Sequence, residues 1–334
     1  MSSILYIGNK LKKQNVASIS ALGFFLEKEG FIINYASCEP NKILRLCDML
    51  WSCFKFRNEV DYVLIDTYST QNFYYAFFVS QLCRVLNLKY IPILHGGNLP
   101  KRLQNNPRLS GLLFKNAYKN VAPSLYLKTI FEAYGYKNIV HIPNTIEINN
   151  YPFEKREFKN IRLLWVRSFS EIYNPELAVK VLKILKEEGF DASLTMVGPD
   201  ADGSLKNVRS LADSLDVRVV FTGKLPKKEW IELSKSHNIF INTTNFDNMP
   251  VSVIEAMALG LPVVSTNVGG MPYLIEDKVD GVLVNPNSVS EFVSAIKKLL
   301  QDTNETYEMA KKARRKVENF DWSVVKAKWF SVLS

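Results

Sequence analysis

Short apolar runs alternate with longer segments of helical periodicity along the whole chain. In the first part the strand-like runs are ILYIG (4–8), FIINYAS (31–37), DYVLIDT (61–67), YIPILHGG (90–97), NVAPS and NIVHIPN. Helical patterns over about 16–29, 42–54 and 73–87 separate them. Strands that are apolar throughout and joined by helices indicate a parallel sheet that is covered on both faces.

The alternation breaks at EINNYPFEKREFKN (147–160) and then restarts with IRLLWVR (161–167). Further helices and strands follow in turn, and a last helix begins near Asp321. We therefore expect an α/β protein of two Rossmann-like domains that face a cleft. The expected domains are residues 1–150, 151–318 and a C-terminal helix, 319–334, that returns to the first domain.

The composition is that of an ordinary globular protein, with 47% hydrophobic and 22% charged residues in 334. The four cysteines, Cys38, Cys47, Cys53 and Cys83, contain no CxxC pair, which favours reduced thiols over disulfides. The N-terminus runs from an apolar strand into basic residues, the reverse of a signal peptide. The aromatic run FYYAFFVSQLCRVL is too short to span a membrane. We expect a cytoplasmic protein.

The positive charge is concentrated in the first domain. The residues up to Phe158 include 19 basic and 11 acidic ones, so they carry +8 of the net +9. Between Lys101 and Phe131 there are basic residues, Lys101, Arg102, Arg108 and Lys115 among them, and no acid. This surface is either a solvated face or a contact with an anionic membrane at the inner side of the cell. No nucleic-acid-binding pattern accompanies it, so nucleic acid is disfavoured.

The stretch DNMPVSVIEAMALGLPVVSTNVGG (247–270) holds the candidate chemistry. Ser252 and Glu255 have the spacing of a capping box, which would explain both residues without a ligand. The alternative is an anion site, because a helix start after a parallel strand is where α/β sheets bind phosphates. Both interpretations are compatible with the residues.

The same stretch resembles the donor site of family 4 retaining glycosyltransferases of the GT-B fold. That family has a carboxylate, seven residues, a Glu, an Ala-Met-Ala-like helix, Gly, Pro-Val-Val and Gly-Gly. WVRSF, TMVGP, VVFTGKLPKKEW and IPNTIE are similar to further family segments, in order. The resemblance implies transfer of a sugar from a nucleotide diphosphate-sugar to a glycan or lipid-linked acceptor, with retention, in surface polysaccharide assembly.

The resemblance also implies roles for individual residues. Arg167 would grip the diphosphate, Asp247 would hold the transferred sugar, and Glu255 would bind the ribose. His95, followed by two glycines, would face the sugar and acceptor. The other donor-binding residues implied are Gly8, Asn9, Gly198, Gly223, Lys224, Leu225, Asn248, Met249, Val251 and Ser252.

Two departures from the family pattern concern the donor. The first carboxylate is Asp247 where Glu is usual, and a phosphate-binding Lys after Arg167 is missing, with Tyr173 or Asn174 in its place. The sequence contains three histidines and no DxD-like pair, so we expect no metal and no cofactor.

Two other functions stay open. A sugar-nucleotide epimerase would need acid/base carboxylates, for which Asp66 and Glu132 are candidates. A non-catalytic partner subunit would turn over no donor.

Overall fold

The computed structural model describes residues 2–10 and 18–334. The chain divides into two compact units, Met1–Thr145 with Trp322–Ser334, and Ile146–Asp321. The first helix is described from Ser18 onward, so the expected start near residue 16 lies outside the described residues.

The first unit contains one parallel sheet with the strand order β2-β1-β3-β4-β5-β6. Its strands are β1 (Ser3–Ile7), β2 (Ile32–Ala36), β3 (Tyr62–Thr67), β4 (Lys89–Leu94), β5 (Asn120–Ala122) and β6 (Ile139–His141). From β1 the chain moves to one edge and then returns to place β3 on the other side. The strand order therefore reverses between β1 and β3.

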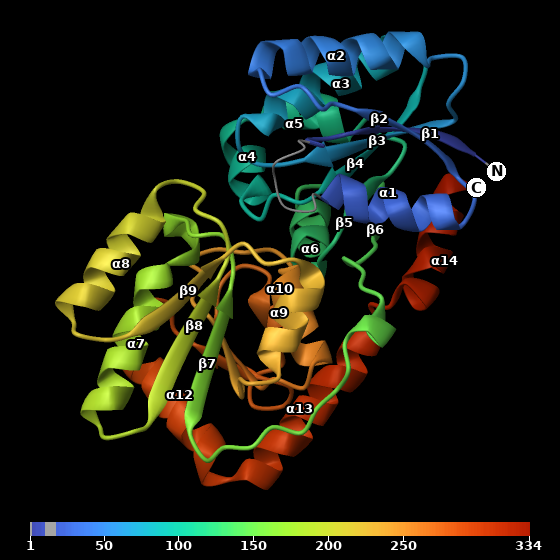
Figure 1. Ribbon diagram of the computed structural model, residues 1–334. Coiled ribbons are helices and arrows are strands. Elements are labelled where there is room, and N and C mark those ends of the chain that lie inside the picture. The colour runs from blue at the N-terminus through green and yellow to red at the C-terminus, as the bar shows by residue number, and fades with distance from the viewer. Residues whose placement is uncertain (1, 11–17) are drawn as a thin grey trace. The chain divides into compact units, whose positions relative to one another are not determined.

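Helices cover both faces of this sheet (Figure 1). They are α1 (Ser18–Lys28), α2 (Lys42–Lys55), α3 (Asn72–Val85), α4 (Leu99–Asn105), α5 (Pro107–Phe114), α6 (Leu125–Ala133) and α14 (Trp322–Leu333). Leu5 and Ile7 pack in a buried cluster with residues of α2 to α6. Ile4 and Tyr6 point to the opposite face and pack with α1 and α14. This alternation is the two-residue period of a strand that is buried on both sides.

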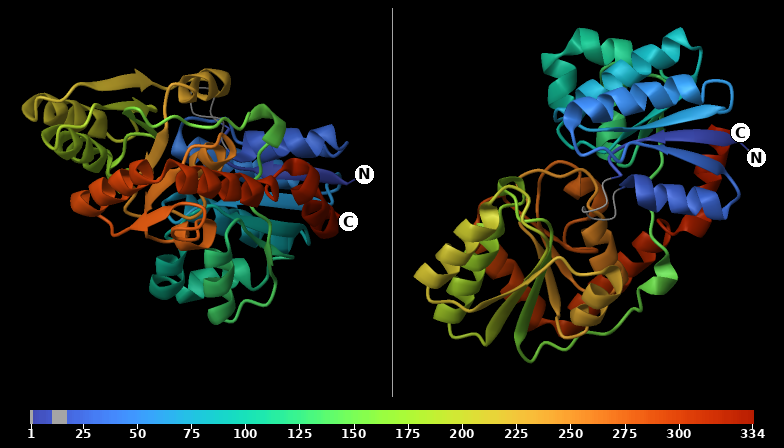
Figure 2. Two further views of the ribbon diagram at one scale, coloured as in Figure 1. Left: turned by 90° about the horizontal axis from the view of Figure 1, so that it is seen from below. Right: turned by 45° about the horizontal axis from the view of Figure 1, so that its top comes forward.

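Helix α14 is part of the first unit although it ends the chain. Its Trp322 ring stacks on Phe25 at 5.0 Å between centroids, and its Nε1 donates to Glu29 at 3.0 Å. The Ser2 hydroxyl donates to the carbonyl of Leu333 at 3.0 Å, and the two chain ends lie side by side in every view (Figure 2). The C-terminal helix thus completes the core on one face of the first sheet.

The second unit contains a parallel sheet with the order β12-β11-β10-β7-β8-β9. Its strands are β7 (Ile161–Val166), β8 (Ala192–Val197), β9 (Val219–Gly223), β10 (Ile239–Asn242), β11 (Val263–Thr266) and β12 (Val282–Val284). The chain runs from β7 outward to β9 and then returns to the other side of β7. The reversal here lies between β7 and β10.

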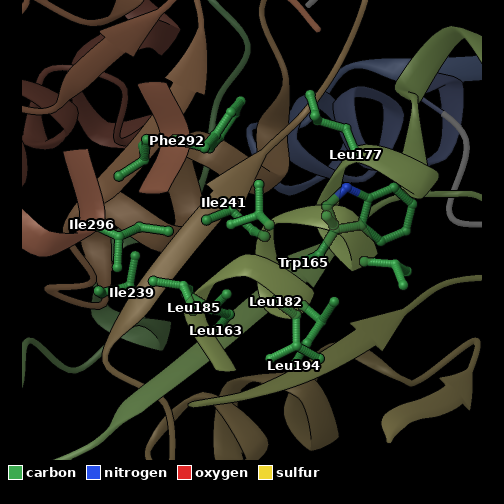
Figure 3. Close-up of a cluster of buried hydrophobic side chains, with 14 of the residues drawn as sticks. Leu163, Trp165, Leu177, Leu182, Leu185, Leu194, Ile239, Ile241, Phe292 and Ile296 are labelled. Atoms are coloured by element: carbon green, nitrogen blue, oxygen red, sulfur yellow. The ribbon is translucent and has the colours of Figure 1, made fainter. Parts of the chain in front are cut away.

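The helical segments of the second unit pack on the two faces of its sheet. They are η1 (Ile148–Asn150), η2 (Glu171–Tyr173), α7 (Pro175–Glu187), α8 (Ser204–Ser214), α9 (Lys227–Ser234), α10 (Val251–Ala258), α11 (Met271–Leu274), α12 (Val289–Gln301) and α13 (Thr303–Glu318). Leu163 and Trp165 lie in the cluster with α7 and α12 (Figure 3), whereas Leu164 packs with α10. The Trp165 indole donates to Thr243 Oγ1 at 3.0 Å, which ties this core to the loop after β10.

Helix α14 allows a test of how much the C-terminal segment stabilises the first unit. Trp329 is 3% exposed and packs with the strands. Trp329→Ala should lower the free energy of unfolding by about 3–5 kcal/mol, because a large cavity replaces the ring. Val324→Ala is the matched control on the same helix, where the side chain is 48% exposed. Urea denaturation measures both. An equal, small loss in the two variants would contradict the packing role of α14.

Candidate functional site

The carboxyl ends of the strands in the second sheet form one edge, because all of the strands are parallel. Arg167 directly follows β7, Gly198 follows β8, and Gly223 ends β9. A polar loop, residues 243–250, follows β10. In open α/β sheets this edge, at the point where the strand order reverses, is the usual place for a ligand.

Arg167 and Asp247 form an ion pair across this reversal point. The guanidinium also stacks over the Tyr173 ring, 4.3 Å from its centroid. Burial lowers the pKa of the Arg167 guanidinium below its usual value. Its buried Nε has no hydrogen-bond partner among the described residues. The side chain is therefore held in place while part of its donor capacity is unfilled.

The loop that carries Asp247 rests on the glycine pair of the motif. The amide of Gly270 donates to the carbonyl of Asp247 at 3.0 Å. A Cβ at Gly269 would collide with that carbonyl, and a Cβ at Gly270 with the carbonyl of Asn248. Thr266 Oγ1 adds a hydrogen bond to the carbonyl of Thr244 at 2.6 Å. The glycine pair is thus required by close backbone approach to the loop.

A second close approach joins the ends of β7 and β8. Gly198 has φ +153° and a Cβ there would overlap the carbonyl of Arg167. Its amide donates to the carbonyl of Gly223 at 2.9 Å. Beyond β9, Lys224 is exposed and Leu225 packs partly into the core of the unit. Gly198 therefore brings three of the predicted positions to one edge.

Helix α10 follows the loop, and it corrects the capping-box interpretation. The helix starts at Val251, its N-cap is Pro250, and no side chain caps it. Ser252 lies inside the first turn, where its buried hydroxyl has no partner among the described residues. The Glu255 carboxylate does not return to the helix start. The capping-box alternative is wrong, because helix formation begins one residue before Ser252.

Glu255 is instead held by two residues that the sequence analysis did not select. The Tyr151 hydroxyl donates to Glu255 Oε1 at 2.7 Å, and Lys227 forms an ion pair with the same oxygen. Glu255 is 3% exposed. Burial of the Tyr151 hydroxyl, and then the nearby charge of Glu255, raises the pKa of Tyr151. Lys227 lies two residues after Leu225, in the basic run KLPKK. This run is the feature of the sequence that could have indicated a cation near Glu255.

The neighbouring residues of the motif occupy the same loop and helix start. Asn248 and Met249 are buried, and Val251 is half-buried. The backbone amide of Asn248 donates to Asp247 Oδ1 at 2.8 Å. Two residues stand in place of the missing lysine, and they make different contacts. The Tyr173 ring stacks on Arg167. The side-chain amide of Asn174 donates to Asn287 Oδ1 at 2.7 Å.

In the first unit the strand order reverses beside a buried carboxylate, Asp66 at the end of β3. Its Oδ1 accepts from the Tyr6 hydroxyl at 3.0 Å and from His95 Nε2 at 2.9 Å. Burial, and then the nearby Asp66, raises the pKa of Tyr6 well above its usual value. The His95 ring also stacks on Tyr68 with centroids 5.4 Å apart. Because a carboxylate accepts, His95 Nε2 carries the hydrogen of this bond.

The predicted residues Gly8 and Asn9 lie beside this carboxylate. A Cβ at Gly8 would come within 2.8 Å of Asp66 Oδ2, and Asn9 Oδ1 accepts from Arg45 at 3.3 Å. A small cavity is lined by these residues with Tyr68. Glu132, the other epimerase candidate, is exposed on α6 and pairs with Lys128 at 2.8 Å. It is engaged on the helix surface and not in the Asp66 network.

The basic stretch after β4 is less uniform than its sequence suggests. Lys101, Arg108 and Lys115 are exposed on α4 and around α5. Arg102 instead donates to the carbonyl of Ser69 at 2.7 Å and stacks on Phe73. Leu103, Leu113 and Phe114 face the core, and Leu112, at 42%, is the one large apolar side chain of this stretch that is exposed. Among the described residues, no helix is long and apolar enough to cross a bilayer.

The described residues contain no cluster of three or more His, Cys, Asp or Glu side chains that could hold a metal ion. The second sheet brings together one guanidinium, the partly buried carboxylate of Asp247, the buried carboxylate of Glu255 and a helix start. This combination suits an anionic ligand with hydroxyl groups.

Two parallel α/β units of this kind define the GT-B fold, and solved structures agree. The chain superposes on HepE of Anabaena in complex with UDP-glucose, with a TM-score of 0.80, 18% identity and coverage of 100% and 99% of the two chains. Sucrose-phosphate synthase from Thermosynechococcus elongatus gives a TM-score of 0.84, 16% identity and coverage of 99% and 98%. Residues 148–317 match the family described as glycosyl transferases group 1, and the chain belongs to this family.

Two curated relatives match about half of the chain. The amylovoran biosynthesis glycosyltransferase AmsK of Erwinia amylovora is 30% identical over 165 residues, which is 47% of this chain and 40% of the relative. The sulfoquinovosyl transferase SQD2 of Arabidopsis thaliana is 29% identical over 157 residues, 46% of this chain and 30% of the relative. The chain thus spans less than half the length of these two relatives.

The unpaired Ser252 hydroxyl gives a direct test of the α10 geometry. Ser252→Ala should change the free energy of unfolding by less than about 0.5 kcal/mol, since no cap is lost and a buried unpaired hydroxyl is removed. Thermal and urea unfolding of the free protein measure this. Ser124→Ala is the control, because Ser124 caps α6 through the amide of Leu127 at 3.1 Å. If Ser252→Ala lowers the free energy of unfolding as much as the control does, Ser252 caps the helix after all.

Proposed function

We propose that the chain binds a nucleotide diphosphate-sugar at the carboxyl edge of its second sheet. The observation that carries this proposal concerns Arg167, which is held by Asp247 and Tyr173. Its buried Nε has no hydrogen-bond partner within residues 2–10 and 18–334. A diphosphate has acceptor oxygens for that nitrogen and suits a fork-shaped cation. The start of α10 at Val251 offers further donors next to the same loop.

The reaction proposed is transfer of the sugar to a glycan or lipid-linked acceptor with retention at the anomeric carbon, as in family 4. The bond between the anomeric carbon and the diphosphate oxygen breaks, and a bond to the acceptor oxygen forms on the same face. The acceptor proton passes to the leaving diphosphate. Arg167 and the α10 amides would stabilise the charge that develops there, which is the main source of rate enhancement expected at such a site.

The remaining residues receive roles by their chemistry. Asp247 would accept hydrogen bonds from sugar hydroxyls once the diphosphate engages Arg167. Glu255, held by Tyr151 and Lys227, would accept from the ribose. Gly198, Gly223, Lys224 and Leu225 would border the base. The assignments of Gly8, Asn9 and His95 in the first unit stay predictions.

Similar proteins support this choice of donor and process. HepE was solved with UDP-glucose, which supports UDP as the nucleotide to test first. AmsK takes part in amylovoran biosynthesis, and the relative WcaL of Escherichia coli is described as a colanic acid biosynthesis glycosyltransferase. Both names support surface polysaccharide assembly as the process.

Replacing Arg167 tests the proposal. Replacing Arg162, an arginine in the preceding strand β7, is the matched control. Arg167→Ala should weaken UDP binding about tenfold to a hundredfold, because charge-assisted hydrogen bonds worth about 1.5–3 kcal/mol are lost. Arg162→Ala is the control, since Arg162 lies at the start of β7 and pairs with Asp191 at 3.0 Å. Calorimetric titration with UDP measures both. Unchanged binding in Arg167→Ala would contradict the proposed donor site.

We propose further that the reaction needs no metal ion, since Arg167 and the α10 amides would neutralise the diphosphate. The release of UDP from UDP-sugar in the presence of acceptor should be the same with and without EDTA. Loss of turnover on chelation that magnesium or manganese restores would contradict metal independence.

The two alternative functions give different outcomes in the same assays. An epimerase would convert the UDP-sugar without any acceptor. A non-catalytic subunit would turn over none of a panel of UDP-, GDP- and ADP-sugars, even if UDP binds.

A further inference from the structure

The outward face of helix α2 exposes a row of large apolar side chains. Ile43 is 74% exposed, Leu44 56%, Trp51 62% and Phe54 45%. They recur at helical spacing, so they form one stripe about 17 Å long. The opposite side of α2 packs Met49 and Cys53 into the core. The stripe is therefore a second apolar face on a helix that has already satisfied its packing against the sheet.

Helix α3 extends this surface. It packs beside α2 on the same face of the first sheet (Figure 1), and its Tyr74, Phe78 and Val85 are 41%, 47% and 78% exposed. Because both helices bury their inner sides against one sheet face, their outer residues point away from it together. We call these seven residues of α2 and α3 the apolar face.

Cations flank the apolar face at the helix ends. Lys42 begins α2, Lys55 ends it, and Arg84 lies in the last turn of α3, all exposed. The Arg57 guanidinium lies 4.1 Å from the centroid of the Phe54 ring. Asp48 is the one acidic residue in the sequences of the two helices. The face thus combines aromatic and aliphatic side chains with a positive rim.

We propose that the apolar face docks on the surface of an anionic lipid bilayer. Large aliphatic and aromatic side chains enter the boundary between headgroups and acyl chains, and Lys and Arg at the rim reach the lipid phosphates. A second copy of the chain fits less well, because a twofold contact through this face would bring its cations against one another. The basic stretch at residues 101–115 exposes less apolar surface, so the bilayer contact is assigned to α2 and α3.

Trp51 provides a direct reporter of this contact. It is 62% exposed, whereas Trp165, Trp230, Trp322 and Trp329 are 7% exposed or less. With phosphatidylglycerol vesicles at low salt, tryptophan emission should shift to shorter wavelength, and brominated acyl chains should quench it. Trp51→Phe should keep co-sedimentation with the vesicles and lose the quenching, since an aromatic ring remains but the reporter does not.

The surface itself is tested with Ile43→Ser combined with Phe54→Ser. This variant should bind the vesicles at least about tenfold more weakly, because two buried apolar groups are lost from the bilayer contact. The matched control combines Phe24→Ser and Val324→Ser, two residues that are each 48% exposed on the helices of the opposite sheet face. The control should bind like the unaltered chain. All substituted side chains are exposed, so thermal unfolding should stay unchanged.

Several results would overturn the proposal. One is that the unaltered chain ignores anionic vesicles at low salt. Another is that Ile43→Ser with Phe54→Ser binds equally well, or that Trp51 shows no quenching while the protein sediments. If light scattering finds that the unaltered chain is a dimer and that this double variant is a monomer, a second copy covers the face instead. None of these measurements uses a sugar donor, so they are independent of the proposed transferase activity.

Discussion

The candidate site of the second unit depends on one constraint of the sheet. β7 and β10 are neighbours, but the strand that follows β7 lies on one side of this pair and the strand that follows β10 lies on the other. Their carboxyl ends therefore have no connecting segment between them, and the side chains that follow must meet each other. Arg167 and Asp247 do so as an ion pair. A partly buried pair of this kind is costly to desolvate and is stabilising only when its remaining donors and acceptors are satisfied. The unfilled Nε of Arg167 marks where that condition is not met.

Several neighbouring residues hold the Arg167–Asp247 pair and the loop around it in place. Tyr173 stacks on the guanidinium, and the glycine pair 269–270 allows the Asp247 loop to approach β11. Trp165 links the core to the same loop through Thr243. On α10, Glu255 is held by Tyr151, which lies near the start of the second unit. The candidate site is thus built from a strand end, a loop and a helix, and each of its charged side chains contacts a second residue that holds it.

The alternation of apolar runs and helical patterns was enough to predict the α/β class, because strands buried on both faces carry an unmistakable pattern. The GT-B fold came from the resemblance and is confirmed by the solved structures. Helix α13 was missed, although its buried Thr306, Met309, Ala313 and Val317 follow helical spacing. Its many charged residues mask that stripe in the sequence.

The sequence suggested single candidate residues for the site but not the residues that hold them. Arg167, Asp247 and Glu255 follow from the motif, whereas the Tyr151–Glu255 contact joins residues 104 positions apart and has no local signal. The capping-box interpretation was wrong although Ser252 and Glu255 have the right spacing. A Ser252 cap would start the helix at Val253, whereas α10 starts two residues earlier, at Val251. Likewise, no pattern in the sequence indicates which apolar side chains of α2 stay exposed, since this depends on how α3 packs against it.

The central claim is that a diphosphate replaces Asp247 as the partner of Arg167. Calorimetric titration of Asp247→Asn tests it most directly, first with UDP and then with UDP-glucose. The asparagine keeps the oxygen that accepts from the Asn248 amide and removes the charge that competes for Arg167. Asp247→Asn should bind UDP as tightly as the unaltered chain or more tightly, while the additional affinity for the sugar falls. Weaker binding of UDP itself would contradict it.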